Sequence, residues 1–217
     1  DSAIADVSGS NGFESDNDAA GSTLTPKTSA VFANMTLVGP RQNTTNVGNA
    51  LFRNGAQIRR NSSLSVINSV LLGWPTGLLI DASTGRPTDL NISSDNTLKW
   101  AGNIIAGCTT PLKYSASNAA PTGWTITDVT NWHNTPAFKN AILANTTDAG
   151  YTAPFNYTNP DLTPLNGSAV LTAGIDYTDP SNYDLVIDST SLTPEEVVDK
   201  IMVEVEKFKE QEESKTD

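Results

Sequence analysis

Three charged residues recur at one position of a short sequence pattern, and they are the first candidates for chemistry. Asp16, Arg59 and Asp81 each stand four residues after a glycine, at the end of a short predicted strand. If these segments are neighbouring parallel strands, the three side chains stack about 4.8 Å apart and form a charged ladder. Such a ladder either fixes the strand register through surface ion pairs or forms part of a groove for a saccharide or a cation. Both interpretations remain open from the sequence.

Carboxylates near the start of the chain could bind a metal ion. Glu14, Asp16 and Asp18 alternate along the chain, so in a strand they point to one side. Calcium prefers clustered oxygen ligands, but this spacing matches no complete calcium loop. The sequence therefore predicts either an acidic turn or a weak calcium site, and Ca²⁺ is the only cofactor it suggests.

A catalytic hypothesis uses the same residues. In a calcium-dependent lyase, the metal would neutralise a uronate and Arg59 or Arg60 would act near the abstracted proton, with Asp81 as a third weak candidate. Trp74 could stack on a sugar ring if it is exposed, although tryptophan more often fills a core. His133 is the one histidine of the chain, and we expect it to be hydrogen-bonded in a loop. Because no further catalytic constellation is visible, we expect a protein without catalytic activity.

A repeat in the sequence indicates how these residues are positioned. Residues 32–39, 66–73 and 100–107 follow one another at a spacing of 34 residues, each with large apolar first and sixth positions and a closing glycine. A fixed spacing of this kind is typical of repeat architectures in which each unit packs on the next. The sequence predicts a mainly β fold, a right-handed parallel β-helix of about three coils over residues 1–110.

The rest of the chain lacks this spacing. We expect residues 111–190 to form an irregular cap, with a short helix over 135–143 that starts at Thr135 and Pro136. Residues 191–217 predict an amphipathic helix and a frayed tail, because Thr193 and Glu196 match a capping box. This helix either packs on the rest of the protein or provides a protein contact from Pro194 to Phe208.

Composition limits the partners. Ser, Thr and Asn supply 68 of 217 residues, and the net charge is −11 without a basic stripe, so nucleic acid is not an expected partner. No apolar run is long enough to span a bilayer, and we expect no direct membrane insertion. The single cysteine, Cys108, is predicted to be a small buried hydrophobe.

Two blocks of sequence resemble a known class of proteins. Residues 5–18 resemble a signature of secreted or surface lipoproteins of the Bacteroidetes type, and residues 58–61 with 73–81 are similar to a second block of that family. The resemblance implies an exported β-helical repeat protein, at the bacterial outer membrane or outside the cell, in a family without an established activity. It also implies that Ser2 and Ser189 are O-glycosylation sites, because the triplets around them match the phylum's pattern.

These observations predict an exported surface or adhesion scaffold whose ligand is a glycan or another surface protein. The alternative is a carbohydrate-active enzyme, similar to a calcium-dependent polysaccharide lyase, with part of its site upstream of this sequence.

Overall fold

The structure is a computed structural model that describes residues 9–45, 50–175 and 192–213, with side chains up to residue 207 in the last range. The chain divides into two compact units, Asp1–Ile175 and Asp176–Asp217.

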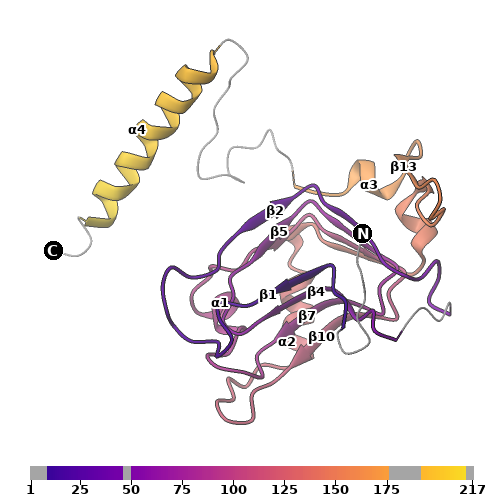
Figure 1. Cartoon of the computed structure of the whole chain (residues 1–217), viewed down its shortest axis with the longest axis horizontal. Helices are drawn as coiled ribbons and strands as arrows, with labels where there is room; N and C mark the ends of the chain where they lie inside the picture. The colour runs from indigo at the N-terminus through magenta and orange to yellow at the C-terminus, as the bar shows by residue number, and fades with distance from the viewer. Residues whose placement is uncertain (1–8, 46–49, 176–191, 214–217) are drawn as a thin grey trace. The chain divides into compact units, whose positions relative to one another are not determined.

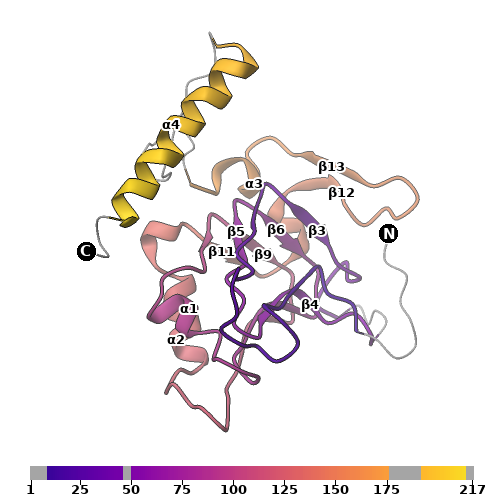
Figure 2. The ribbon, with the colours of Figure 1, turned by 60° about the vertical axis from the view of Figure 1, so that its left-hand side comes forward.

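The first unit contains three parallel sheets and one antiparallel pair of strands (Figure 1). The first sheet has the order β1 (Phe13–Ser15), β4 (Asn54–Arg59), β7 (Thr76–Asp81) and β10 (Thr110–Ser115). The second contains β2 (Val31–Ala33), β5 (Ser65–Ile67) and β8 (Trp100–Ala101). The third contains β3 (Thr36–Val38), β6 (Val70–Leu72), β9 (Ile104–Ala106) and β11 (Ala141–Leu143), side by side in Figure 2. The antiparallel pair is β12 (Tyr151–Ala153) with β13 (Asp161–Pro164).

Short helices connect these strands. They are α1 (Leu90–Ser93), α2 (Ile126–His133), α3 (Ala169–Thr172) and the 3₁₀ helices η1 (Pro136–Phe138) and η2 (Thr146–Ala149). A capping box starts α2, because the Thr125 side chain accepts a backbone bond and Asp128 accepts one from the Thr125 backbone.

The 34-residue repeat sets the strand register. Phe32 pairs with Val66 and Val66 with Trp100, so the equivalent residues of successive repeats lie on neighbouring strands. The same shift places Leu71 between Leu37 and Ile105 in the third sheet. The prediction that matching side chains stack on one another is therefore confirmed by the pairing.

Each repeat turns sharply between its two strands, and the turn has a specific residue requirement. Asn34, Asn68 and Gly102 occupy this position with φ of 59°, 48° and 69°. Asparagine and glycine are the residues that adopt this left-handed conformation at low cost. The repeats can therefore change direction at the same place in every copy.

Side chains next to these turns bind the backbone of the neighbouring repeat, and we call Ser69, Asn103 and Asn140 the corner ladder. The Met35 N–H donates to Ser69 Oγ (3.1 Å), the Ser69 N–H to Asn103 Oδ1 (2.9 Å) and the Asn103 N–H to Asn140 Oδ1 (2.9 Å). Asn103 is fully buried, and its Nδ2 also donates to the Val66 carbonyl at 2.8 Å. The corner ladder thus satisfies backbone groups that the strands leave unpaired at the turn.

All three parallel sheets contribute to one apolar core. Ile58 and Ile80 come from the first sheet, Val66 and Trp100 from the second, and Leu71 from the third, all 1% exposed or less. Burial of this apolar surface is the main stabilising contribution to such a fold.

Cys108 joins the same core, as predicted. It is 6% exposed, and desolvation raises the pKa of its thiol to about 11. The thiol is therefore neutral at ordinary pH and behaves as an apolar group.

The predicted fold class is wrong and is corrected by this arrangement. We predicted a mainly β, right-handed parallel β-helix of about three coils, but the strands form several separate parallel sheets together with helices. The arrangement is mixed α and β, and a single β solenoid is not indicated. The first and third sheets each have four strands, because β10 and β11 join them from beyond residue 109.

The segment predicted as irregular is also more regular than expected. Residues 111–190 include most of β10 and all of α2, β11, β12 and β13. The helix predicted over 135–143 is a single 3₁₀ turn, η1, because Lys139 adopts φ 50° and ends it. The chain then enters β11 instead of continuing as a helix.

The second unit contains the predicted C-terminal helix, α4 (Pro194–Glu213). Its capping box is confirmed, because the Thr193 N–H donates to Glu196 Oε2 (2.8 Å) and the Glu196 N–H to Thr193 Oγ1 (3.3 Å). The Phe208 side chain lies outside the described side chains, and a protein contact through Pro194–Phe208 stays a prediction. In the ranges that the structure describes, no helix combines the length and apolar character needed to cross a bilayer.

Candidate functional site

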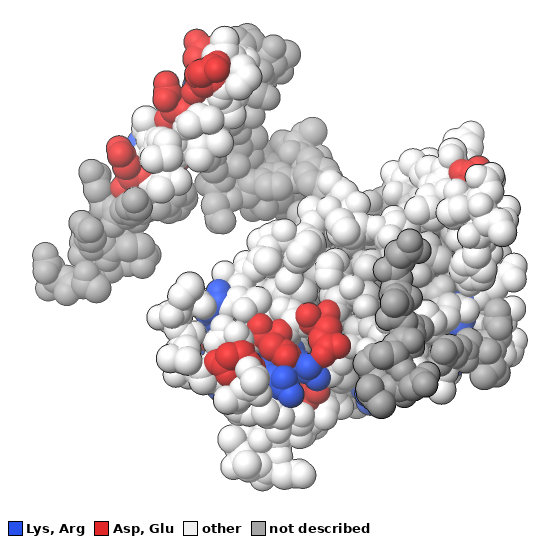
Figure 3. Space-filling view, in the orientation of Figure 1, with Lys and Arg blue, Asp and Glu red and all other residues white. Residues whose placement is uncertain are grey.

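The structure brings the charged residues of the sequence pattern together on the outer face of the first sheet. Arg59 pairs in register with Asp81, and its Nε lies 2.6 Å from Asp16 Oδ1. Its Nη2 donates to the second oxygen of the same carboxylate at 3.2 Å, and Arg60 Nη1 lies 2.9 Å from Asp16 Oδ2. Figure 3 shows these charges as a compact red and blue group on an otherwise largely white face. We call Asp16, Arg59 and Asp81 the surface ladder.

The groups of the surface ladder are already bound to one another or to neighbours. Asp81 accepts hydrogen bonds from Gln57 Nε2 (3.2 Å) and the Ser83 N–H (3.0 Å). The hydrogen bond with Asp16, with further attraction from Glu14 and Asp81, raises the pKa of Arg59 against the opposing effect of its partial burial. This guanidinium holds its proton firmly, which does not suit a group that must accept one.

The hollow beside the surface ladder is small. It is lined by Arg59, Arg60, Asp81, Ser83 and Thr84 and has a volume of about 90 Å³. Pockets that enclose small ligands have volumes of about 300–1,000 Å³. A sugar ring therefore has no enclosed site at this position.

Each of the three alternating carboxylates already has a partner, and Glu14 and Asp16 share Arg59. Glu14 forms an ion pair with Arg59, Asp16 binds two arginines, and Asp18 accepts hydrogen bonds from the Ser22 hydroxyl and the Ala20 N–H. The bond from Ser22 lowers the pKa of Asp18. Among the described residues, no group of three or more His, Cys, Asp or Glu side chains is placed to hold a metal ion.

Trp74 is a core residue in this fold. It is 5% exposed, its indole N–H donates to the Leu37 carbonyl at 3.0 Å, and its ring meets Phe52 edge-on at 6.2 Å. A ring in this position does not present a face to a ligand at the surface. Ser2 and Ser189, the predicted modification sites, lie outside the described residues.

His133 is hydrogen-bonded as expected, but it is buried at the end of α2 rather than placed in a loop. Its Nδ1 lies 3.1 Å from Asn134 Oδ1, while Nε2 has no hydrogen-bond partner among the described residues. Desolvation lowers the pKa of this imidazole, so the ring is neutral at pH 7.

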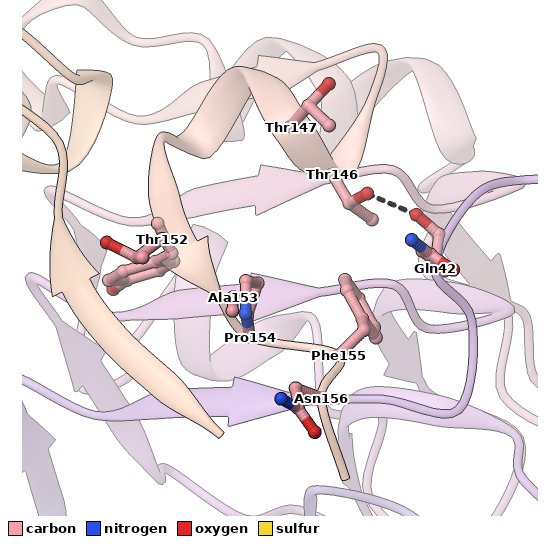
Figure 4. Close-up of a pocket in the computed structure, with 9 residues that line it drawn as sticks. Gln42, Thr146, Thr147, Thr152, Ala153, Pro154, Phe155 and Asn156 are labelled. Atoms are coloured by element: carbon pink, nitrogen blue, oxygen red, sulfur yellow. Dashed lines mark hydrogen bonds between the residues drawn. The ribbon is translucent and has the colours of Figure 1, made fainter. Parts of the chain in front are cut away.

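A larger pocket involves residues that the sequence pattern did not single out. We call it the threonine pocket; it has a volume of about 380 Å³ (Figure 4). None of the side chains that line it is a carboxylate, ammonium, guanidinium or imidazole group. The lining residues are Gln42, Thr146, Thr147, Tyr151, Thr152, Ala153, Pro154, Phe155 and Asn156. A pocket lined by hydroxyls, amides and aromatic rings suits a neutral ligand that carries hydroxyl groups.

Local contacts hold this pocket in shape. The capping box of η2 and Gly150, with φ of 79°, turn the chain from the helix into β12. Tyr151 Oη lies 2.9 Å from Thr36 Oγ1, and the Thr146 hydroxyl donates to the Gln42 carbonyl, drawn as a dashed line in Figure 4. Thr152 Oγ1 donates to the Thr163 carbonyl at 2.9 Å, which joins β12 to β13.

Some polar groups of the pocket remain available. Within the described ranges, the Gln42 amide, the Thr147 hydroxyl and Asn156 Nδ2 have no hydrogen-bond partner. Asn156 is oriented by its oxygen, which accepts from Thr158 Oγ1 (2.9 Å) and from the Asn159 N–H (3.2 Å). Figure 4 shows Asn156 next to the Phe155 ring on the same side of the pocket.

The lining residue Phe155 is one ring of an aromatic pair. The rings of Phe155 and Tyr157 meet edge-on at 6.2 Å, with an interplanar angle of 83°. Tyr157 is 68% exposed, although desolvation still raises the pKa of its hydroxyl. An exposed aromatic ring beside amides and hydroxyls is the combination on which sugar rings stack. The closely spaced aromatic and amide residues of 151–157 were the sequence signal for this site.

Comparison with protein-family models, with curated proteins and with solved structures finds no match to this chain.

Proposed function

We propose that this chain is a non-catalytic, exported surface protein that binds neutral glycans through the threonine pocket. The observation that carries the proposal is a pocket of about 380 Å³ without formally charged side chains, together with the exposed ring of Tyr157 that packs on the lining residue Phe155. Neutral sugars offer hydroxyls for the Gln42 and Asn156 amides and a C–H face for the ring.

Export is supported by the resemblance of residues 5–18 to surface lipoproteins and by the composition. Ser, Thr and Asn make up 68 of 217 residues, so hydroxyls and amides provide much of the polar surface. Another surface protein remains the alternative ligand.

The lyase alternative is not favoured by the positions of its candidate residues. Arg59 and Arg60 share the Asp16 carboxylate, and Asp81 is held by Gln57. Each candidate would have to leave an existing partner before it could act on a substrate.

Binding can be measured by calorimetry with neutral tetrasaccharides of β-linked glucose, xylose and mannose. We expect saturable binding of at least one of them. Tyr157→Ala should weaken it about 2- to 10-fold, because one stacked ring contributes about 0.5–1.5 kcal/mol.

Tyr157→Phe is the matched control, because it keeps the ring and removes only the hydroxyl. It should retain most of the affinity. Absence of binding to all three sugars, or equal affinities of the Ala and Phe variants, would contradict the proposal.

A further inference from the structure

A second hollow lies on the outer face of the first sheet, away from the residues of the threonine pocket. We call it the cationic hollow; it has a volume of about 420 Å³ and is lined by Phe52, Arg53, Asn54, Gln57, Pro75, Thr76, Leu79 and Lys113. Its lining contains two cations and no carboxylate. In a chain with a net charge of −11, this is an unusual concentration of positive charge.

The strand register explains why the face is hollowed here. Gln57, Leu79 and Lys113 lie opposite one another on β4, β7 and β10. Neighbouring strands are about 4.8 Å apart, so Gln57 and Lys113 stand about 10 Å apart across the shorter Leu79. Leu79 forms an apolar floor and is 7% exposed.

Among the described residues, neither Arg53 nor Lys113 has an ion-pair partner, whereas Arg59 and Arg60 both do. Both residues are exposed.

Two carboxylates next to Gln57, which lines the hollow, already have partners among the described residues. Glu14, which is in register with Gln57, pairs with Arg59. Asp81 accepts a hydrogen bond from Gln57. Among the described residues, the positive charge of the hollow therefore has no carboxylate partner, and its exposed side chains can meet an anionic ligand.

The uncharged lining defines the rest of the ligand. Asn54 Nδ2 donates to Asn11 Oδ1 (2.8 Å) and Gln57 Oε1 (3.3 Å), which fixes both amides on one wall. Thr76 adds a hydroxyl, and Leu79 with Pro75 adds apolar surface. Amides and a hydroxyl beside an apolar floor suit a sugar ring, and the cations suit an acidic group on it.

We propose that the cationic hollow binds an acidic saccharide, with Arg53 and Lys113 on the carboxylate of a uronic acid residue. This deepens the proposed glycan-binding function, but it depends on different residues and can fail separately. The overall negative charge disfavours densely charged polymers such as nucleic acids, so a ligand with few acidic groups is expected.

The test is calorimetric titration of the whole chain with a trimer of β-1,4-linked glucuronic acid. Cellotriose is the neutral counterpart, and sodium sulfate is the simple anion. We expect the uronate trimer to bind more tightly than either, with an affinity that falls as NaCl is raised from about 50 to about 500 mM.

Charge-removing variants assign the binding to the hollow. Arg53→Gln and Lys113→Gln should each weaken uronate binding about two- to fivefold, the range of a lost ion pair at an exposed position. Lys99→Gln is the matched control, since Lys99 is an exposed lysine that binds Asn96 outside the hollow, and it should change nothing. Because the three substituted residues are exposed, each variant should fold, and thermal unfolding checks this.

The proposal is wrong if cellotriose or sulfate binds as tightly as the uronate trimer. It is also wrong if the uronate trimer binds with unchanged affinity after both substitutions. Tyr157→Ala distinguishes the two sites. It should weaken neutral glycan binding at the threonine pocket and leave the uronate affinity unchanged.

Discussion

The corner ladder and the surface ladder are built by the same principle but lie in different surroundings. Both arise because equivalent positions of successive repeats stack on neighbouring strands. Asn103 of the corner ladder is fully buried and bonds to two backbone groups. The Arg59 side chain of the surface ladder is 24% exposed and bonds to carboxylates.

This difference in burial determines how much each ladder contributes to the free energy of unfolding. A buried backbone group that loses its partner costs about 1–3 kcal/mol, because water cannot replace that partner. Ion pairs at the surface contribute about 0–1 kcal/mol, since water and salt compete for both charges. We infer that polar side chains at the turns stabilise the repeats more than the charged residues do.

The largest expected effect comes from breaking the corner ladder. Asn103→Ala should lower the free energy of unfolding by about 2–4 kcal/mol, because the Ser69 N–H and the Val66 carbonyl each lose a buried partner. Urea denaturation measures this change. The control is Asn131→Ala, at an exposed position of α2, which should change the free energy of unfolding by less than about 0.5 kcal/mol. Similar losses of stability in the two variants would show that the corner ladder contributes no more than an exposed asparagine.

A second prediction concerns His133, a buried polar residue that lacks the full set of partners found in the corner ladder. Burial lowers its pKa from the ordinary value of 6.5, so below about pH 6.5 the unfolded chain takes up a proton that the folded chain refuses. The free energy of unfolding should therefore fall as the pH is lowered from about 7.5 to about 5.0.

The measurement is urea denaturation at several pH values. His133→Gln should flatten the pH dependence in this window, whatever its effect at neutral pH. If the free energy of unfolding of the variant depends on pH as steeply as that of the original protein, His133 does not cause the loss of stability at low pH.

The smallest expected effect comes from the surface ladder. Arg59→Gln should lower the free energy of unfolding by about 0.5–1 kcal/mol in low salt and by less in about 1 M NaCl. Asp16 keeps Arg60 as a partner, which limits the loss. The control is Arg53→Gln, because Arg53 is an exposed arginine without an ion pair in the described part of the chain. An equally large loss of stability in this control would contradict a contribution from the ion pairs.

The stacking of equivalent residues could be predicted from the sequence because the repeat is nearly regular over its first three copies. The shared position of Asp16, Arg59 and Asp81 after a glycine likewise predicted that these three side chains would be neighbours. The spacing of 34 also links Thr76 to Thr110 and so contained the signal for β10. Ala141 lies 37 residues after its partner Ile104, and this departure from 34 hid β11.

The threonine pocket could not be derived from the repeat. Gln42 meets Thr146 across more than 100 residues of sequence, and their contact depends on how η2 and β12 pack after the repeats end. No periodic pattern encodes that packing. Trp74 shows a different limit of the sequence. A tryptophan suits both a sugar-binding surface and a core, and only the packing around Trp74 shows that it belongs to the core.

The unequal connections in the first sheet have a consequence for how such a protein can vary. Phe13 pairs with Ala56 after 43 residues, Ala56 with Leu78 after 22, and Leu78 with Leu112 after 34. The strands keep their pairing although the chain between them nearly doubles in length. Because the entropy cost of a loop grows slowly with its length, segments between these strands are suited to insertions that alter the molecular surface while the interior stays the same.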